Sequence, residues 1–159
     1  MRDSQKSKLY AWENRECDAL RYDHKHECEP QMEIREIKKL VTRVARDYGL
    51  SHRKVRVKDG RGRRAACYCA SERAIKLPRW ARREVVVLHE LAHWLIQVFG
   101  HYNNASHGRE FTGVFMELLR RYHGLDLAVM QQSANKVRLD FSPNSQCTAR
   151  YLKQNCLFR

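Results

Sequence analysis

Residues 78–100 read PRWARREVVVLHELAHWLIQVFG, and this stretch dominates the interpretation of the chain. Pro78 is typical of a helix start and Gly100 of a helix end, so we expect one long helix from Pro78 to about Phe99. The middle of this stretch, Val85–Leu88 and Leu91–Val98, is apolar on nearly every side. A helix without a polar face is buried, which predicts that this segment is the central helix of the fold.

Apolar periodicity upstream predicts two helices. The first is expected to be capped by Ser4 and to run towards Arg21, with Leu9, Trp12, Cys17 and Leu20 facing inward. The second is expected to begin at Pro30 and to end at Gly49. Its apolar residues recur at helical spacing: Ile34, Ile37, Leu40, Val41, Val44 and Tyr48.

The pattern then changes to short alternating runs that are typical of strands. Strands are expected around Val55 and Val57, over Ala65–Ala70 and over Ala74–Leu77. After the central helix, a helix capped by Ser106 should end at Gly124, and a shorter one should cover Asp126–Asn135. The order of helices, a three-stranded sheet and further helices predicts an α+β fold.

Residues 89–93 read HELAH, which is an HExxH motif inside the expected central helix. Residues four positions apart lie on one helix face, so His89 and His93 can bind one metal ion from the same side. Catalytic zinc takes three protein ligands and lowers the pKa of a bound water to about 7. Glu90 could take the proton of that water and deliver it to a leaving amine. The alternative is a pair of hydrogen-bonded core histidines with Glu90 at the surface.

A catalytic zinc site needs a third protein ligand. The spacing HExxHxxGxxH would require Gly at position 96 and His at position 99, where this chain has Ile96 and Phe99. The remaining candidates lie further on: His101, His107, Glu110 and Glu117. We favour His107, because it ends the loop after the central helix and opens the next helix. Glu117 is the second choice, since a glutamate from another helix is also a common ligand.

Two segments resemble the SprT-like, or Spartan-like, zinc metalloprotease family. HELAH at 89–93 followed by SHGREF at 106–111 is similar to the family's HExxH and His-Gly-x-x-Phe segments. The stretch AACYC at 65–69 followed by AIKL at 74–77 resembles its cysteine-containing hairpin. The opening RDSQKSKLYAWE also resembles a small metallohydrolase family of actinobacteria and their phages.

The SprT-like resemblance covers residues 53–124 and implies a specific site. His89, His93 and His107 would be zinc ligands and Glu90 the general base. The implied fold is a minimal zincin-like domain with a small three-stranded sheet packed on the HExxH helix. Members of the family cleave proteins crosslinked or bound to DNA. This chain lacks the C-x-x-C zinc ribbon that many of them add.

The net charge of +13 is unevenly distributed along the chain. Between Arg53 and Arg83 there are 12 Lys and Arg residues against Asp59 and Glu72. Such a block is typical of a surface for a polyanion, most simply DNA, although a solvated face is the alternative. Trp80 lies within this block and could stack on a base, but as a first-turn aromatic of a buried helix we expect it in the core.

The 159 residues are enough for a single domain with a core of its own. We divide residues 1–159 into N-terminal helices (1–50), the SprT-like core (53–124) and a C-terminal tail (140–159). The N-terminus has no apolar signal region, and no segment offers the roughly 20 apolar residues of a membrane span. We therefore expect a cytoplasmic protein with reduced cysteines that does not enter a membrane.

Several further residues are weaker candidates for a role at the site. Cys67 and Cys69 are expected to pack in the core. A second metal site built from Cys17, His24, His26 and Cys28 has no specific spacing to support it. Candidates for stabilising an oxyanion are His101, Tyr102, Tyr122 and His123. Candidates for a carboxylate that holds a ligating imidazole are Glu117 and Asp126.

The sequence therefore favours a zinc-dependent metallohydrolase, most simply a metallopeptidase that acts on protein or peptide near nucleic acid. A second hypothesis is a non-catalytic nucleic-acid-binding protein with a structural or vestigial metal site. A third is a metal-dependent hydrolase of another substrate, because an activated water attacks other electrophiles too.

Overall fold

The structure is a computed structural model that describes residues 5–14, 30–51, 55–99 and 106–142. Within these ranges the protein is an α+β fold in which α-helices pack against a three-stranded sheet. The α-helices are α1 (Lys6–Trp12), α3 (Ile34–Asp47), α4 (Glu84–Val98), α5 (Arg109–Leu118) and α6 (Leu127–Lys136). The strands are β1 (Arg56–Asp59), β2 (Cys67–Cys69) and β3 (Ala74–Leu77). Two short elements complete the set: the 3-10 helix η3 (Arg79–Ala81) and the π-helix η4 (Leu119–His123).

The sheet has the strand order β1-β3-β2. β3 is central, pairs in parallel with β1 and antiparallel with β2, and buries Ala74, Ile75 and Leu77. This burial explains why Ala74–Leu77 reads as a continuous apolar strand with Lys76 as its single polar residue. β2 is an edge strand of this sheet, and its residues are half-buried.

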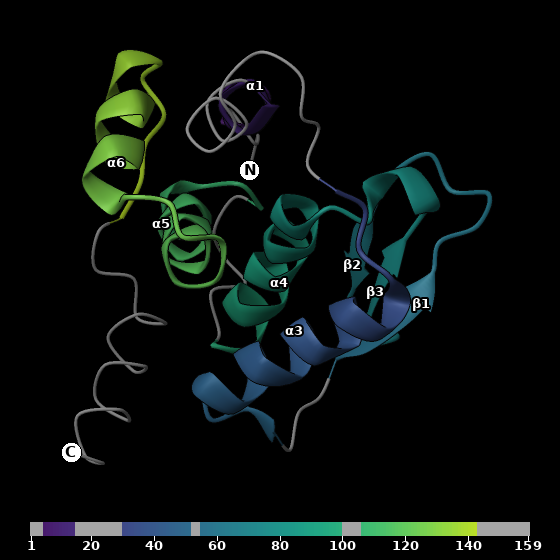
Figure 1. Cartoon of the computed structure of the whole chain (residues 1–159). Helices are drawn as coiled ribbons and strands as arrows, with labels where there is room; N and C mark the ends of the chain where they lie inside the picture. Colours follow the sequence, from purple (N-terminus) through teal and green to yellow (C-terminus); the bar gives the residue numbers. More distant parts are fainter. Residues whose placement is uncertain (1–4, 15–29, 52–54, 100–105, 143–159) are drawn as a thin grey trace.

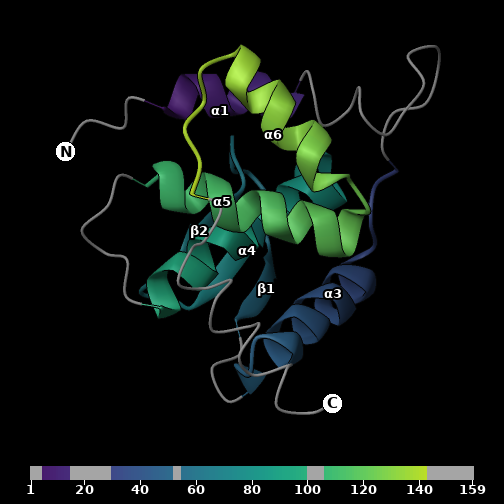
Figure 2. The ribbon, with the colours of Figure 1, turned by 90° about the vertical axis from the view of Figure 1, so that its left-hand side faces the viewer.

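Helix α4 is the centre of the fold, as its sequence predicts. It lies between the sheet and α5, and α6 lies beyond α5 (Figure 1). The view turned by 90° shows the same order, with α5 and α6 in front of α4 (Figure 2). Nine residues of α4 are buried, among them Leu88, Leu91 and Leu95. No helix in the described ranges has the length and apolar character needed to cross a membrane.

The ends of three helices differ from the sequence expectation. α3 begins at Ile34 rather than Pro30, because Glu33 and Glu36 form a reciprocal capping box at that point. It ends as predicted, before Gly49 in a left-handed conformation. α5 begins at Arg109 with Gly108, not Ser106, as its N-cap residue. The first helix, α1, buries Leu9 and Trp12 as expected, but its N-cap residue is Gln5 and not Ser4. Cys17 and Leu20 lie outside the described residues.

The central helix also begins later than predicted. Pro78 leads into η3, and α4 starts only at Glu84. A tertiary hydrogen bond explains the break, because the carbonyl of Arg82 accepts from the backbone N–H of Met32 at 2.7 Å. The expectation that Trp80 lies in the core is consequently wrong. Its side chain sits on η3 outside the buried helix and is 53% exposed.

Candidate metal centre

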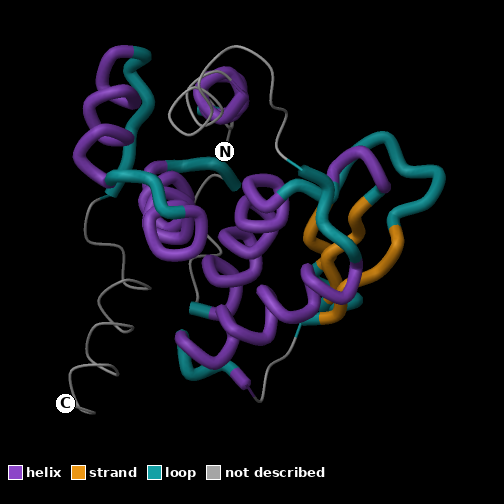
Figure 3. The backbone as a smooth tube through the Cα atoms, viewed as in Figure 1, coloured by secondary structure: helices purple, strands orange, loops and turns teal. Residues whose placement is uncertain are grey.

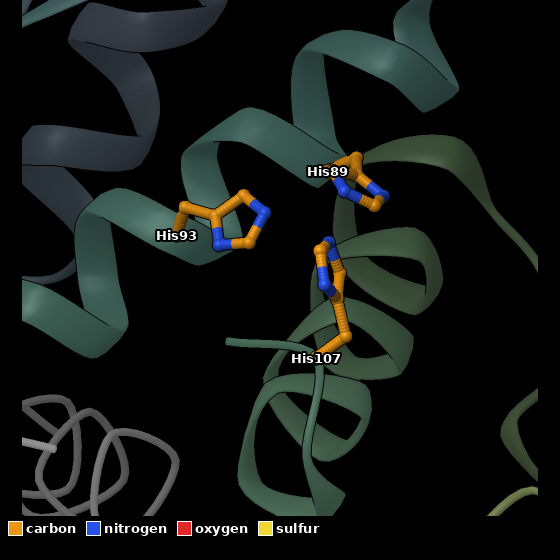
Figure 4. Close-up of side chains that lie close together, drawn as sticks. All are labelled: His89, His93 and His107. Carbon is orange, nitrogen blue, oxygen red and sulfur yellow. The ribbon is translucent and has the colours of Figure 1, made fainter. Parts of the chain in front are cut away.

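Three histidines converge on one point beside α4. His89 and His93 lie one turn apart on this helix, and His107 lies just before α5 (Figure 4). One ligand atom from each ring lies within 4.8 Å of the others. The ring centroids are 4.8–5.3 Å apart. The structure thus brings together the three residues that the sequence favours as metal ligands.

Packing between α4 and α5 holds the three rings in place. Phe111 and Phe115 lie one turn apart on α5 and are buried against the histidines. The Phe111 ring centroid is 4.4 Å from that of His93 and 5.0 Å from that of His107, and the Phe115 ring is 5.4 Å from His89. These phenyl rings form an apolar wall that restricts the rotamers of the imidazoles and excludes water from one side of the group.

The chemistry of the donor set fits a metal ion. His89 is 2% exposed, and its buried Nε2 atom has no hydrogen-bond partner among the described residues. A buried polar nitrogen of this kind is costly unless something binds it. Tetrahedral zinc with bonds of about 2.0–2.1 Å needs nitrogen atoms about 3.4 Å apart, so small side-chain rotations would complete the site. Three imidazoles leave a fourth position open, as in catalytic rather than structural zinc sites.

Glu13 at the end of α1 orients the first histidine. Its Oε2 atom lies 2.9 Å from Nδ1 of His89, and both side chains are buried. Burial alone would lower the pKa of His89, but the charge and hydrogen bond of Glu13 outweigh it and raise that pKa. A carboxylate on Nδ1 favours the tautomer that carries its proton there, which leaves Nε2 free to bind a metal.

The expectation that Glu117 or Asp126 would play this part is wrong. Both oxygens of Glu117 accept bonds from Arg120 at 2.9 Å, and Arg121 also donates to it. Although burial opposes ionisation, these bonds hold the pKa of Glu117 below its usual value. Asp126 caps α6 by accepting from the backbone N–H of Val129. Neither Glu117 nor Glu110, the two alternative third ligands within the described ranges, belongs to the histidine group.

Sequence reasoning missed Glu13, although a signal for it exists. Position 13 is four residues after the buried Leu9 and one after the buried Trp12, so it lies on the inward face of α1. A carboxylate on an apolar face needs a partner, because buried charge is costly when left alone. The partner itself could not be identified, since His89 lies 76 residues away in the chain.

Glu90 lies beside the histidines and is buried, not at the surface. It is 6% exposed, and its Oε2 atom accepts a 2.6 Å hydrogen bond from the backbone N–H of Tyr68 on β2. Burial raises the pKa of Glu90, while His89 and the Tyr68 N–H act in the opposite direction. A raised pKa is typical of a carboxylate that exchanges protons near neutral pH.

Tyr10 is a second residue of α1 that sequence reasoning missed. Its ring stacks on His89 with centroids 5.4 Å apart and an interplanar angle of 13°, and it lies 5.4 Å from His107. Two of the residues expected to stabilise an oxyanion, Tyr122 and His123, are within the described ranges and contact other side chains. The hydroxyl of Tyr122 donates to Asp47 at 3.0 Å, and Nδ1 of His123 lies 2.7 Å from Glu84. α1 therefore forms one wall of the histidine site.

Other expectations fall outside the described ranges or change in detail. His101, Tyr102 and the Cys17–Cys28 group lie outside the described residues, as does the tail from 143 onward. Cys67 and Cys69 are half-buried on β2 rather than in the core. Hydrogen bonds with Ser71 and Glu72 lower the pKa of Cys69. Comparisons with protein-family models, curated proteins and solved structures find no match to this chain.

Glu13 offers a direct test of how the site is held. We expect Glu13→Ala to weaken zinc binding about 10–100-fold, because partners of ligating histidines contribute this much to metal affinity. Glu13→Gln should lose less, since its amide oxygen can still accept from Nδ1 of His89. Competition with a chromophoric chelator measures both affinities. Asn14→Ala, at the exposed neighbouring position, is the control. Unchanged affinity in Glu13→Ala would show that the contact does not support the site.

Proposed function

We propose that the protein is a zinc-dependent metallopeptidase. The observation that carries this proposal is the convergence of His89, His93 and His107 with the buried carboxylate of Glu90 alongside. The α+β fold with a three-stranded sheet against a buried HExxH helix is compatible with a minimal zincin-like domain. The resemblance to the SprT-like family supports the same site and the same chemistry.

In the proposed reaction each residue has a distinct part. The three histidines would hold the ion. Zinc there would act as a Lewis acid and make hydroxide available at neutral pH. Glu90 accepts a proton from the attacking water and transfers it to the departing amine, so that no net proton is left on the enzyme. Glu13 keeps His89 in the orientation that the site needs.

The position of β2 supports a peptide as substrate. This strand lies at the edge of the sheet, and Tyr68 in its middle donates to Glu90. An extended peptide that added to this edge would run beside the proposed general base. Main-chain hydrogen bonds of this kind can bind a peptide, whereas a small ester has no peptide backbone with which to form them.

Metal dependence tests this proposal. The purified chain should contain zinc by elemental analysis, and it should hydrolyse casein or mixed fluorogenic peptides. Removal of the metal with a chelator should abolish hydrolysis, and stoichiometric zinc should restore it. Parallel assays with an aryl ester and with DNA test the other hydrolase classes. Hydrolysis of only the ester or the DNA would overturn the peptidase assignment, and an absence of bound or titratable zinc would overturn the whole proposal.

A second candidate function is nucleic-acid binding around a structural metal site. The exposed arginines of the 53–83 block favour it. This candidate predicts salt-dependent binding to DNA that survives replacement of Glu90, together with no hydrolysis of any peptide.

A further inference from the structure

Two arginine-rich segments follow β1 and β3 at the same end of the sheet. β1 and β3 are parallel and in register from Arg56↔Ala74 to Asp59↔Leu77, so the residues that follow them are neighbours. The backbone N–H of Gly60 donates to the carbonyl of Leu77 at 3.0 Å. A Cβ atom at Gly60 would lie only 2.6 Å from the nitrogen of Pro78, so the two backbones are in close contact. η3 and the loop after β1 lie at the same end of the sheet (Figure 3).

The cationic side chains of these segments, 61–64 and 79–83, are all arginine. Arg61, Arg63, Arg64 and Arg79 are exposed, and Arg82 and Arg83 are half-buried. Two acidic residues lie next to these segments: Asp59 pairs with Arg82 at 3.1 Å, and Glu84 lies 2.7 Å from Nδ1 of His123. The guanidinium group binds phosphate through two parallel hydrogen bonds, which the ammonium of lysine cannot do. An all-arginine surface therefore fits phosphate groups better than a general cationic surface would.

Trp80 projects from the middle of this surface. It is 53% exposed, the most exposed large apolar side chain in the described ranges, whereas Trp12 and Trp94 are 1% and 2% exposed. Its neighbour Ala81 is fully buried and anchors η3, so the tryptophan stands on a fixed turn. An exposed indole beside the exposed Arg79 combines a stacking platform with a phosphate ligand, whereas the ion pair with Asp59 holds Arg82.

We propose that Trp80 and the exposed arginines of these segments, Arg61, Arg63, Arg64 and Arg79, form a binding surface for single-stranded nucleic acid. An unpaired base stacks on the indole, and the guanidinium groups bind the phosphates on either side. A duplex is a poor ligand for this surface, because the faces of its bases are already covered by stacking. The binding needs neither zinc nor Glu90 and so stands apart from the proposed hydrolysis.

The surface lies close to the histidine site along α4. Arg83 immediately precedes this helix, and His89 follows six residues later, which corresponds to about 9 Å along the axis. A protein attached to a bound strand would be held beside the histidines. This use of the surface, to bring nucleic-acid-associated proteins to the site, rests on the proposed peptidase function.

Titration with a fluorescein-labelled dT12 oligonucleotide tests the proposal. Trp80→Ala should weaken binding roughly five- to a hundredfold, because stacking of one base contributes this much. Trp80→Phe should retain part of the affinity. Unlabelled dT12 should quench tryptophan emission of the wild-type chain and leave that of Trp80→Phe unchanged, since only buried tryptophans remain in the described ranges. An rU12 arm identifies which single-stranded nucleic acid binds more tightly.

Charge variants separate stacking from general attraction. The double variant Arg61→Gln with Arg64→Gln should make the slope of log K against log salt concentration shallower by about 1.4. Each lost phosphate contact accounts for about 0.7 of this change. Arg35→Gln with Lys39→Gln, on the exposed face of α3, removes the same charge and should change little. Wild-type binding by Trp80→Ala, tighter binding of a 12-base-pair duplex, or equal losses in both double variants would overturn the proposal. Glu90→Gln should bind dT12 normally, so a failed hydrolase assay leaves this result interpretable.

Discussion

Replacement of Glu90 by glutamine is expected to leave zinc bound and to lower peptide hydrolysis by about 10²–10⁴-fold. The carboxylate is next to His89 on α4 but is not one of the three converging ligands. Glutamine keeps the size of the side chain, and its amide oxygen can still accept from the Tyr68 N–H. The substitution therefore removes the proton acceptor and preserves the local packing.

Initial rates and metal content of the same preparations provide the measurement. Glu110→Gln is the matched control, because this glutamate is close in the chain to His107, as Glu90 is to His89, but lies outside the histidine group. It should hydrolyse at the wild-type rate. Full activity in Glu90→Gln would rule out Glu90 as the general base, whatever the metal content.

Replacement of His107 by alanine is expected to reduce zinc affinity more than a hundredfold. Structural zinc sites with four protein ligands bind the ion with about 10–16 kcal/mol, which is about 3 kcal/mol per ligand. Each 1.4 kcal/mol corresponds to a tenfold change in affinity. The loss should be severe because His107 comes from a different segment than the other two ligands. Without it, His89 and His93 would hold the ion from one helix face only.

Two further variants decide between the possible third ligands. His101→Ala and Glu117→Gln remove the sequence alternatives, and both should retain wild-type zinc affinity. His107→Asp supplies a carboxylate ligand and should recover part of the affinity that His107→Ala loses. Circular dichroism of the metal-free proteins separates loss of a ligand from loss of the fold. Normal zinc binding by a folded His107→Ala would remove this residue from the site.

Most of the elements, and the three histidines, were predictable because their signals are local. The HExxH spacing places His89 and His93 on one face of any helix that contains them. His107 could be selected because it directly precedes α5, the next helix after the central helix α4. β3 matches its predicted residues, Ala74–Leu77, since a central strand reads as an apolar run. Gly124 ends the α5–η4 segment in a left-handed conformation, as its position predicts.

Hydrogen bonds that compete with the local preference explain two of the misplaced helix starts. Pro30 and Pro78 are good start signals, but at α3 and α4 another group decides where the helix begins. At α3 the competing group is the capping box of Glu33 and Glu36. At α4 it is the bond between Met32 and Arg82, which joins segments about 50 residues apart. Local propensity carries no information on a bond between distant segments.

The α+β order of elements, the buried central helix and the two histidines on it follow from the amino-acid sequence, because periodicity and i,i+4 spacing are properties of a single segment. The surroundings of these histidines depend on the packing of the folded chain. That packing placed Glu13 of α1 on His89 and left Trp80 exposed among arginines. Each of these outcomes follows from how separate segments pack, and packing depends on contacts between residues that no sequence spacing relates.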